Sequence, residues 1–271
     1  MKKTFRNAAV VAALALGSLD ASAQAFLELD TMPAIFGLGV GFAPDYKGSD
    51  DKTGVIAPFG RYTFQNSERY VQLNVTELSF NVLNNRGFRF GPVVNYHFGR
   101  DDNVDDPLVS HMREIDGTVE VGVFGEIVWS DRSNPRNRFI LGSTLFWDAG
   151  GEYNGFRARL NARYWQQVSR AIDLHIGGGL IYGDSKYNSH YFSVTPQNVG
   201  TSGLPLFNAG SGVNEYFVTL GGVMYFSRNW LGAAGLRVSQ ISGDPKDSPI
   251  VSQQGDKTQV IGGIGVAYTW R

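Results

Sequence analysis

The chain has 271 residues, a formal net charge of −1 and 18% charged residues, against about 25% in an average protein. Glycine is frequent, at 34 residues, and cysteine is absent. The near-neutral charge gives no electrostatic footprint for a nucleic-acid partner, and the lack of cysteine excludes disulfides and thiol catalysis.

The first 23 residues have the parts of an export signal. Lys2, Lys3 and Arg6 form a basic start, Ala8 to Leu16 an apolar run, and Ala21 to Ala23 a small-residue cleavage site. The apolar run is too short for a spanning helix, and no later stretch approaches roughly 18 uninterrupted apolar residues. We expect residues 1–23 to be a cleaved signal peptide and residues 24–271 to form one exported domain.

Strict alternation of apolar with polar or small residues fills most of the remaining chain. In residues 88–98 one side carries Phe88, Phe90, Pro92, Val94, Tyr96 and Phe98. A β-strand places such alternating sets on opposite faces. The pattern predicts strands near 33–43, 54–64, 69–75, 77–83, 88–98, 118–129, 138–147, 156–167, 172–182, 213–226, 230–241 and 258–270. No segment has a helical period.

The stretch 69–83 has two interpretations. Before Thr76 the apolar residues, such as Val71 and Leu73, occupy odd-numbered positions. After Thr76 they occupy even-numbered positions, as Leu78 and Phe80 do. Two short strands, or one long strand with a β-bulge, produce such a change. We favour two strands, because only an even count places both termini of a barrel on the periplasmic side.

The strand lengths and the connections are typical of outer-membrane barrels. Eleven residues at about 3.3 Å each, tilted by about 40°, rise roughly 28 Å, close to an apolar band of about 25 Å. Short turns at 84–87, 168–171 and 227–229 alternate with long loops at 99–117, 183–212 and 242–257. The short turns are expected to face the periplasm.

A soluble barrel or sandwich would also alternate, with its apolar side turned inward. Aromatic residues at the strand ends favour the membrane version, because they suit the two interfaces. They are Tyr62, Phe64, Phe98, Trp129, Trp147, Tyr164, Tyr182, Phe226, Trp230, Tyr268 and Trp270. The sequence therefore predicts an all-β protein, a transmembrane antiparallel up-and-down β-barrel of about a dozen strands in the outer membrane, in contact with its lipids.

Charged side chains occupy the inward parity of these strands. They are Arg89, His97, Glu120, Glu126, Arg157, Arg159, Arg163, Asp173, His175 and Arg237. One interpretation is a weakly anion-preferring pore. The other is a set of cross-strand ion pairs that fills a narrow lumen, together with the inward rings of Phe124, Phe146 and Trp165. If the strands flanking 99–117 pair symmetrically, His97 faces Glu120.

Signs of catalysis and of cofactors are weak. Ser110-His111 and Ser189-His190 lie in long loops, no GxSxG occurs, and the S-x-x-K match at residues 49–52 lies in an acidic loop. No cluster has zinc spacing. Four acids of one loop, Asp101, Asp102, Asp105 and Asp106, are either a divalent-ion site or solvated surface charges. We expect no enzyme activity and no cofactor.

Short motifs in the predicted outer loops resemble those of the MipA/OmpV family of outer-membrane proteins. The resemblance spans the mature chain in order. Its site residues are Asp45, Tyr46, Gly48, Ser49, Gly99, Arg100, Tyr191, Phe192, Ser202, Gly203, Leu204, Pro205, Gly243, Asp244, Asp247, Ser248 and Pro249. Ser193, Pro245-Lys246 and the terminal Arg271 depart from the family pattern. These loop residues are also those that set turn geometry and satisfy loop backbone groups.

The resemblance implies a scaffold that joins a lytic transglycosylase to a bifunctional penicillin-binding protein in murein synthesis. Such partners approach from the periplasm, whereas the motifs lie in outer loops. The periplasmic surface available is the mature N-terminus and the turn 130–137, whose Arg132, Asn134 and Arg136 are the candidate partner-binding residues. The alternatives are a narrow channel for small solutes and an adhesin that presents Tyr187, Tyr191 and Phe192 from loop 183–212.

Overall fold

The structure is a computed structural model that describes residues 34–270. The predicted signal peptide and the mature N-terminus lie outside the described residues. Twelve strands are present: β1 (Ala34–Pro44), β2 (Lys52–Thr63), β3 (Tyr70–Asn74), β4 (Glu77–Asn81), β5 (Phe88–His97), β6 (Thr118–Ser130), β7 (Arg138–Asp148), β8 (Phe156–Gln167), β9 (Ile172–Gly183), β10 (Gly212–Tyr225), β11 (Trp230–Ile241) and β12 (Thr258–Trp270). Each predicted strand is confirmed to within a few residues.

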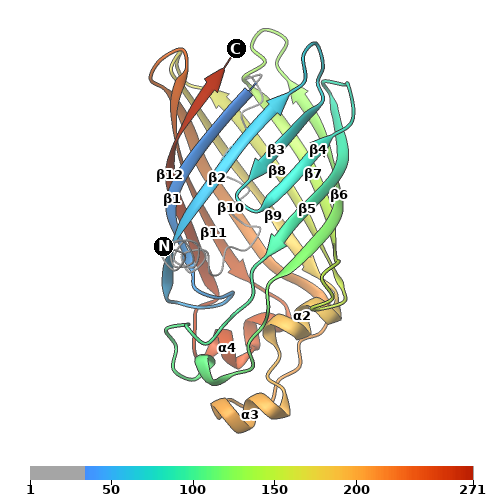
Figure 1. The fold of residues 1–271 in the computed structure, drawn as a ribbon, viewed down its shortest axis with the longest axis vertical. Helices are drawn as coiled ribbons and strands as arrows, with labels where there is room; N and C mark the ends of the chain where they lie inside the picture. Colours follow the sequence, from blue (N-terminus) through green and yellow to red (C-terminus); the bar gives the residue numbers. More distant parts are fainter. Residues whose placement is uncertain (1–33, 271) are drawn as a thin grey trace, which may run out of the picture.

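The strands form one closed antiparallel barrel in which each strand pairs with its neighbours in the chain. Closure is made by β1 and β12, whose register runs from Ala34 opposite Trp270 to Phe42 opposite Gly262. Figure 1 shows the short turns and the C-terminus at one end of the barrel and the long loops at the other. No helix of residues 34–270 is long and apolar enough to cross a membrane.

The stretch 69–83 contains two strands, as predicted. β3 and β4 pair with each other and are joined by the two residues Val75 and Thr76. Both strands have only 5 residues, whereas β2 has 12 and β5 has 10. The hairpin therefore ends partway along the barrel wall, which the sequence pattern did not predict.

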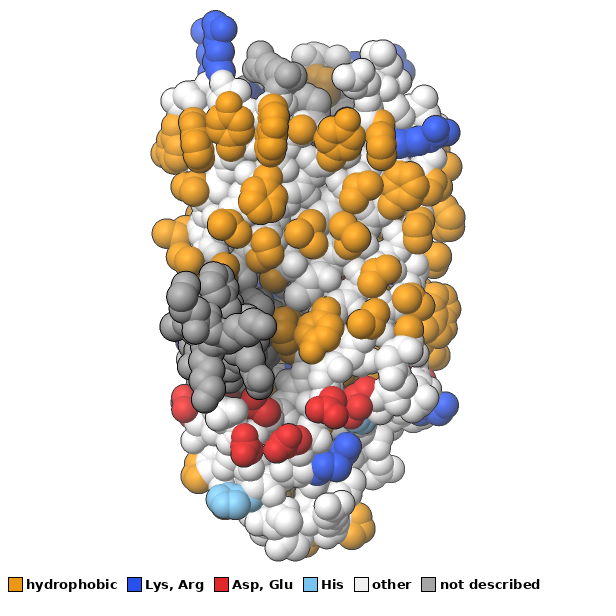
Figure 2. Space-filling model, in the orientation of Figure 1, with side chains coloured by type: hydrophobic (Ala, Val, Ile, Leu, Met, Phe, Trp, Pro, Cys, Tyr) orange, Lys and Arg blue, Asp and Glu red, His pale blue; other side chains and the backbone are white. Residues whose placement is uncertain are grey.

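The outer surface carries the apolar set of the alternation. Leu38, Ile56, Val94 and Leu220 are among the apolar side chains exposed there, and Figure 2 shows such side chains over the whole height of the barrel. Aromatic residues lie near both strand ends, as in the contact of Trp230 with Tyr268. The predicted orientation, apolar residues outward and polar residues inward, is confirmed.

The lumen is filled by large side chains that pack against glycines. Phe124, Phe146 and Trp165 point inward and are buried, as predicted. A Cβ at Gly221 would clash with the ring of His175, and a Cβ at Gly179 would clash with Phe217. Much of the high glycine content thus makes room for bulky side chains in the barrel.

The long loops fold into a compact cap at the outer end. It contains α2 (Ser185–Phe192), α3 (Pro196–Ser202) and α4 (Pro249–Ser252), which the absence of a helical period did not predict. The side chains of Asp184 and Thr195 accept hydrogen bonds from the backbone N–H groups of Tyr187 and Asn198, and so cap α2 and α3. These helices have at most 8 residues, too few to show a period.

Candidate functional site

The inward charges form several groups of ion pairs. In the first group, Glu126 lies between two arginines, 3.1 Å from Arg89 and 2.7 Å from Arg163. These three residues come from β5, β6 and β8, and their side chains face one another because all have the inward parity. The group joins nearby strands of the wall through opposite charges and so satisfies groups that would be costly to bury alone.

The second group lies nearer the outer end and is centred on Glu120. Arg157 donates to both carboxylate oxygens, at 2.8 and 2.6 Å, and Asn95 and Tyr153 donate at 2.8 and 2.7 Å. Residue 95, and not His97, lies directly opposite Glu120 in the register, so the expected facing pair is corrected. His97 sits diagonally, with its Nδ1 3.8 Å from Glu120.

Two carboxylates that complete the pairing were missed in the sequence. Glu77 lies 3.2 Å from Arg159, and Glu215 lies 2.6 Å from Arg237 and 3.3 Å from Lys47. Glu77 could have been found from the sequence, because it follows Thr76 at a position where the alternation of β4 places the side chain inward. For Glu215 the parity is obscured, because the register of β9 and β10 shifts at this point.

The remaining inward residues lie nearer the periplasmic end. Asp173 accepts hydrogen bonds from Arg136 at 2.9 Å and from the hydroxyl of Tyr225 at 3.0 Å. The ring of His175 packs against Trp165, with centroids 4.6 Å apart. All ten predicted lumen residues therefore point inward and contact other side chains. This arrangement favours the second interpretation made from the sequence, in which paired side chains fill a narrow lumen.

The cap closes the outer mouth of the barrel with aromatic side chains. Tyr187, Tyr191 and Phe192 of α2 are 1%, 7% and 0% exposed, so the expectation that they are presented to the exterior is wrong. Tyr187 and Tyr191 pack on His97 with ring centroids 5.8 and 4.8 Å apart. An amphipathic helix whose aromatic face is turned to the lumen explains the difference, because burial of these rings stabilises the closed cap.

The loop motifs of the family resemblance hold the cap together. The hydroxyl of Tyr46 donates to the backbone carbonyl of Gln254 at 2.9 Å. The hydroxyl of Ser248 donates to the backbone carbonyl of Phe192 at 2.6 Å. Arg100 packs over the ring of Tyr46 at 5.9 Å. Burial raises the pKa of Tyr46 and lowers that of Arg100 to about 10.

Further motif residues have the same structural role. The N–H of Gly48 donates to the side chain of Gln259 at 3.1 Å, and Gly48 has a φ of 104°, which favours glycine. The hydroxyl of Ser202 donates within α3, and Leu204 belongs to a buried apolar cluster with Tyr46 and Ile250. The motifs thus join loops 45–51, 183–212 and 242–257 into one folded unit.

Three carboxylates gather on the outside of the cap. Oxygen atoms of Asp45, Asp51 and Asp105 lie within 4.8 Å of one another, and these residues are half-buried or exposed. Burial and the charges of Asp50 and Asp45 raise the pKa of Asp51. Of the four acids singled out in loop 99–117, only Asp105 belongs to this group.

The serines beside histidines have acceptors of their own. The hydroxyl of Ser110 donates to the carbonyl of Pro107 at 3.1 Å, and the hydroxyl of Ser189 donates to the side chain of Asn208 at 3.2 Å. The ring of His111 contacts the same Pro107 carbonyl at 2.5 Å. These contacts organise loops, and they do not give either serine the activated geometry of a nucleophile.

The periplasmic turn 131–137 presents one of the three predicted partner-binding residues. Arg132 is exposed. The side chain of Asn134 donates to Gln167 at 2.7 Å, and Arg136 is held by Asp173 and by the ring of Tyr225 at 4.8 Å. The turn thus leaves Arg132 at the surface and uses Asn134 and Arg136 to fix its own shape.

Exposed arginines also occur on other periplasmic turns. Arg69, Arg86, Arg170 and Arg228 are exposed there. Nearby acids are few, and Glu68 is 2.9 Å from Arg86. Asp131 accepts hydrogen bonds from the Ser133 hydroxyl and N–H, which lower its pKa. The periplasmic rim is therefore basic, in contrast to the acidic cap seen in Figure 2.

The chain forms a closed antiparallel barrel with an outward apolar band, aromatic strand ends and internally paired charges. These features define an outer-membrane β-barrel protein. The model of the family "MltA-interacting protein MipA" matches residues 36–270, and the chain belongs to this family. No curated protein matches the chain.

Solved structures that resemble the chain are distant. The NanC porin has 10% identity and a TM-score of 0.46, over 87% of this chain and 100% of that chain. The translocator domain of autotransporter NalP from Neisseria meningitidis has 11% identity and a TM-score of 0.44, over 89% of each chain. A Pseudomonas aeruginosa FadL homologue has 11% identity and a TM-score of 0.42, over 88% and 91%. With identities and TM-scores this low, these structures say nothing about the function of the chain.

Proposed function

We propose that this outer-membrane barrel acts without catalysis as a scaffold for murein-remodelling enzymes, such as a lytic transglycosylase and a bifunctional penicillin-binding protein. The observation that carries the proposal is membership of the family named for interaction with MltA. We also propose that residues 1–23 are a cleaved signal, on their basic start, apolar run and small-residue site, and that residues 24–271 form the barrel.

The architecture supports a role at the periplasmic rim. The outer mouth is covered by the cap, and the five inward arginines predicted from the sequence are paired with carboxylates. Murein lies on the periplasmic side, where the exposed arginines are. A basic rim attracts a partner with an acidic surface and speeds its encounter with the barrel. The turns are short, so such a partner must itself lie close to the inner leaflet, as a lipoprotein does.

Charge reversal on the rim tests the proposal. We expect Arg132→Glu combined with Arg170→Glu to weaken co-purification of a transglycosylase from detergent extracts, because both side chains are exposed on neighbouring periplasmic turns. Arg136 is left unchanged, since its contact with Asp173 belongs to the barrel.

The matched control is Lys186→Glu, a charge reversal at an exposed residue of the outer cap. Its yield of transglycosylase should equal that of the unchanged protein. An equal yield from the double rim variant would remove these turns from the proposal. Failure of the unchanged protein to capture any murein enzyme would refute the scaffold role.

A further inference from the structure

The barrel wall is incomplete between β2 and β5 on the outer side of the short hairpin. β2 pairs with β3 only over Phe59–Thr63, so residues 52–58 extend beyond the last paired residue. β4 pairs with β5 no further than Asn95. Among residues 34–270 no strand pairs with this free edge of β2. We call the region between residues 52–58, the hairpin tip 75–76 and residues 96–98 the side notch; Figure 1 shows the β3–β4 hairpin ending partway along the wall between β2 and β5.

The local sequence ends the pairing at this point. The last backbone bonds are from the N–H of Val75 to the carbonyl of Pro58, at 2.8 Å, and from the N–H of Tyr96 to the carbonyl of Thr76, at 3.2 Å. Proline has no N–H to donate to a further ladder bond. Val75, the first residue of the two-residue turn between β3 and β4, has a φ of 56°, as a tight hairpin turn requires, although the conformation is unusual for a β-branched residue.

The flanks of the side notch belong to the lipid-facing surface. Ile56 and Leu78, on its two flanks, are 47% and 46% exposed, and their outward side chains belong to the apolar band. The molecules that meet the side notch in the membrane are therefore lipids. Since alternate residues of a strand share an edge, the backbone groups of Gly54 and Ile56 point into the side notch, as the carbonyl of Pro58 does. Such groups require a polar partner in a bilayer.

Two side chains close the side notch. Val75 from the hairpin tip and Phe98 from the end of β5 pack against a buried cluster of Ala43, Val55 and Ile261. No backbone ladder spans these residues within the described chain. Rotation of the Phe98 side chain is a much smaller change than separation of two paired strands, so an opening here leaves the barrel intact.

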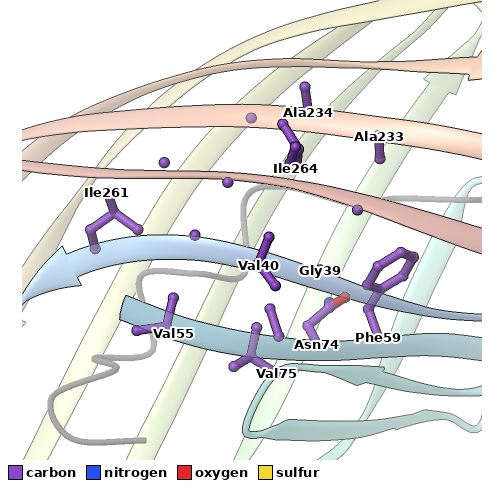
Figure 3. A pocket seen from close by; sticks show the side chains of 16 residues that line it. Gly39, Val40, Val55, Phe59, Asn74, Val75, Ala233, Ala234, Ile261 and Ile264 are labelled. Atoms are coloured by element: carbon purple, nitrogen blue, oxygen red, sulfur yellow. The ribbon is translucent and has the colours of Figure 1, made fainter. Parts of the chain in front are cut away.

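An apolar cavity lies behind the side notch. It has a volume of about 50 Å³ and is bordered by Val55, Ala57, Phe59 and Val75. Its other walls are mostly glycines and alanines of β1, β11 and β12, together with Val40, Ile261 and Ile264 of the same strands and Asn74 of β3 (Figure 3). Elsewhere the lumen contains ion pairs as well as apolar clusters, whereas no charged side chain borders this cavity. It has room for the end of one alkyl chain and not for a whole lipid.

We propose that the side notch is a binding site for a single-chain amphiphile from the outer leaflet. The end of the alkyl chain occupies the cavity beside Ala57, Phe98 moves aside to admit it, and the polar head hydrogen-bonds to the free edge of β2 at Gly54 and Ile56. This site is independent of the periplasmic rim, so neither proposal depends on the other.

Photolabelling tests the site. The protein is placed in phosphatidylcholine nanodiscs that contain a trace of a fatty alcohol with a diazirine at its chain end, and labelled residues are mapped by mass spectrometry. We expect labels on the lumen-facing Val55, Ala57 and Phe59 in addition to lipid-facing residues. Labels confined to lipid-facing residues such as Ile56 would overturn the proposal, without need of any variant.

Variants give a second reading. Ala57→Phe fills the cavity and should abolish the lumen-facing labels, whereas Phe98→Ala should increase them. The matched control is Ala158→Phe, the same exchange at an outward position of β8, which should leave the labels unchanged. Heat-modifiable migration in gels checks that each variant is folded. Lumen-facing labels that persist in folded Ala57→Phe contradict the proposed cavity.

Discussion

Glu120 is the residue on which the contacts of the outer lumen converge. It is fully buried and accepts hydrogen bonds from Arg157, Asn95 and Tyr153. Burial and the charge of Glu120 raise the pKa of Tyr153, so this tyrosine remains a hydrogen-bond donor. Because Tyr153 belongs to the loop that follows β7 and also packs on Tyr187, Glu120 links the barrel wall to the cap.

Loss of Arg157 should destabilise the barrel strongly. Arg157→Ala leaves the Glu120 charge buried without its main partner, and removing one member of such a pair costs about 3–5 kcal/mol. Urea unfolding in detergent, followed by tryptophan fluorescence, measures the loss. Arg132→Ala, at an exposed turn position, is the control and should change the free energy of unfolding by less than about 0.5 kcal/mol. Equal stability of the two variants would contradict the assigned role of the pair.

The inward residues show what parity predicts and what it misses. Arg89, Glu126 and Arg163 were found because regular strands fix the face of every side chain. Glu215 was missed because a register shift breaks the alternation beside it. Which carboxylate pairs with which arginine depends on the shear of the closed barrel, and no single strand encodes the shear.

At the scale of elements, the long strands were predictable and the cap was not. Strands such as β8, which has 12 residues, repeat the alternation of apolar and polar residues often enough to be recognised in the sequence. The helix α2 is stabilised instead by tertiary burial of Tyr187, Tyr191 and Phe192. Short amphipathic elements of this kind are formed by their contacts, which a sequence pattern does not contain.

The cap should loosen in acid through His190 of α2. Burial, and then the positive charge of Arg113, lower the pKa of His190 to about 4, below an unfolded value of about 6.5. Burial favours the neutral ring although the Glu152 carboxylate lies 3.5 Å from its Nε2, so its stabilising contribution is complete above pH about 6.5 and is lost as the pH falls towards 4.

Hydrogen exchange of the backbone amides of α2 between pH 7 and pH 4 measures this effect, after correction for the intrinsic rate. Protection should fall in the acid range in the unchanged protein. His190→Gln carries no titrating ring, and its protection should stay level over the same range. Equal pH dependence in both proteins would show that His190 does not control the cap.

At the scale of the whole molecule, the described lumen contains ion pairs and aromatic rings under a closed cap. A polar cavity beside Glu126 and Arg159 has a volume of only about 30 Å³. A void of this size holds a water molecule or two and not a column of water.

Planar bilayers therefore should show no stable conductance steps when the protein is inserted. Insertion is checked by the protection of the barrel from protease in vesicles prepared in parallel. Regular steps that increase with salt concentration would contradict the filled lumen and favour the narrow channel considered from the sequence.

Tryptophan quenching by brominated lipids tests the orientation of the barrel most directly. Of the five tryptophans, Trp147 is exposed on the outward surface and Trp165 is buried in the lumen. In single-tryptophan variants reconstituted in brominated phosphatidylcholine, the fluorescence of Trp147 should be strongly quenched and that of Trp165 should be nearly unchanged. Strong quenching of Trp165 with protection of Trp147 would show that the apolar face does not contact lipid.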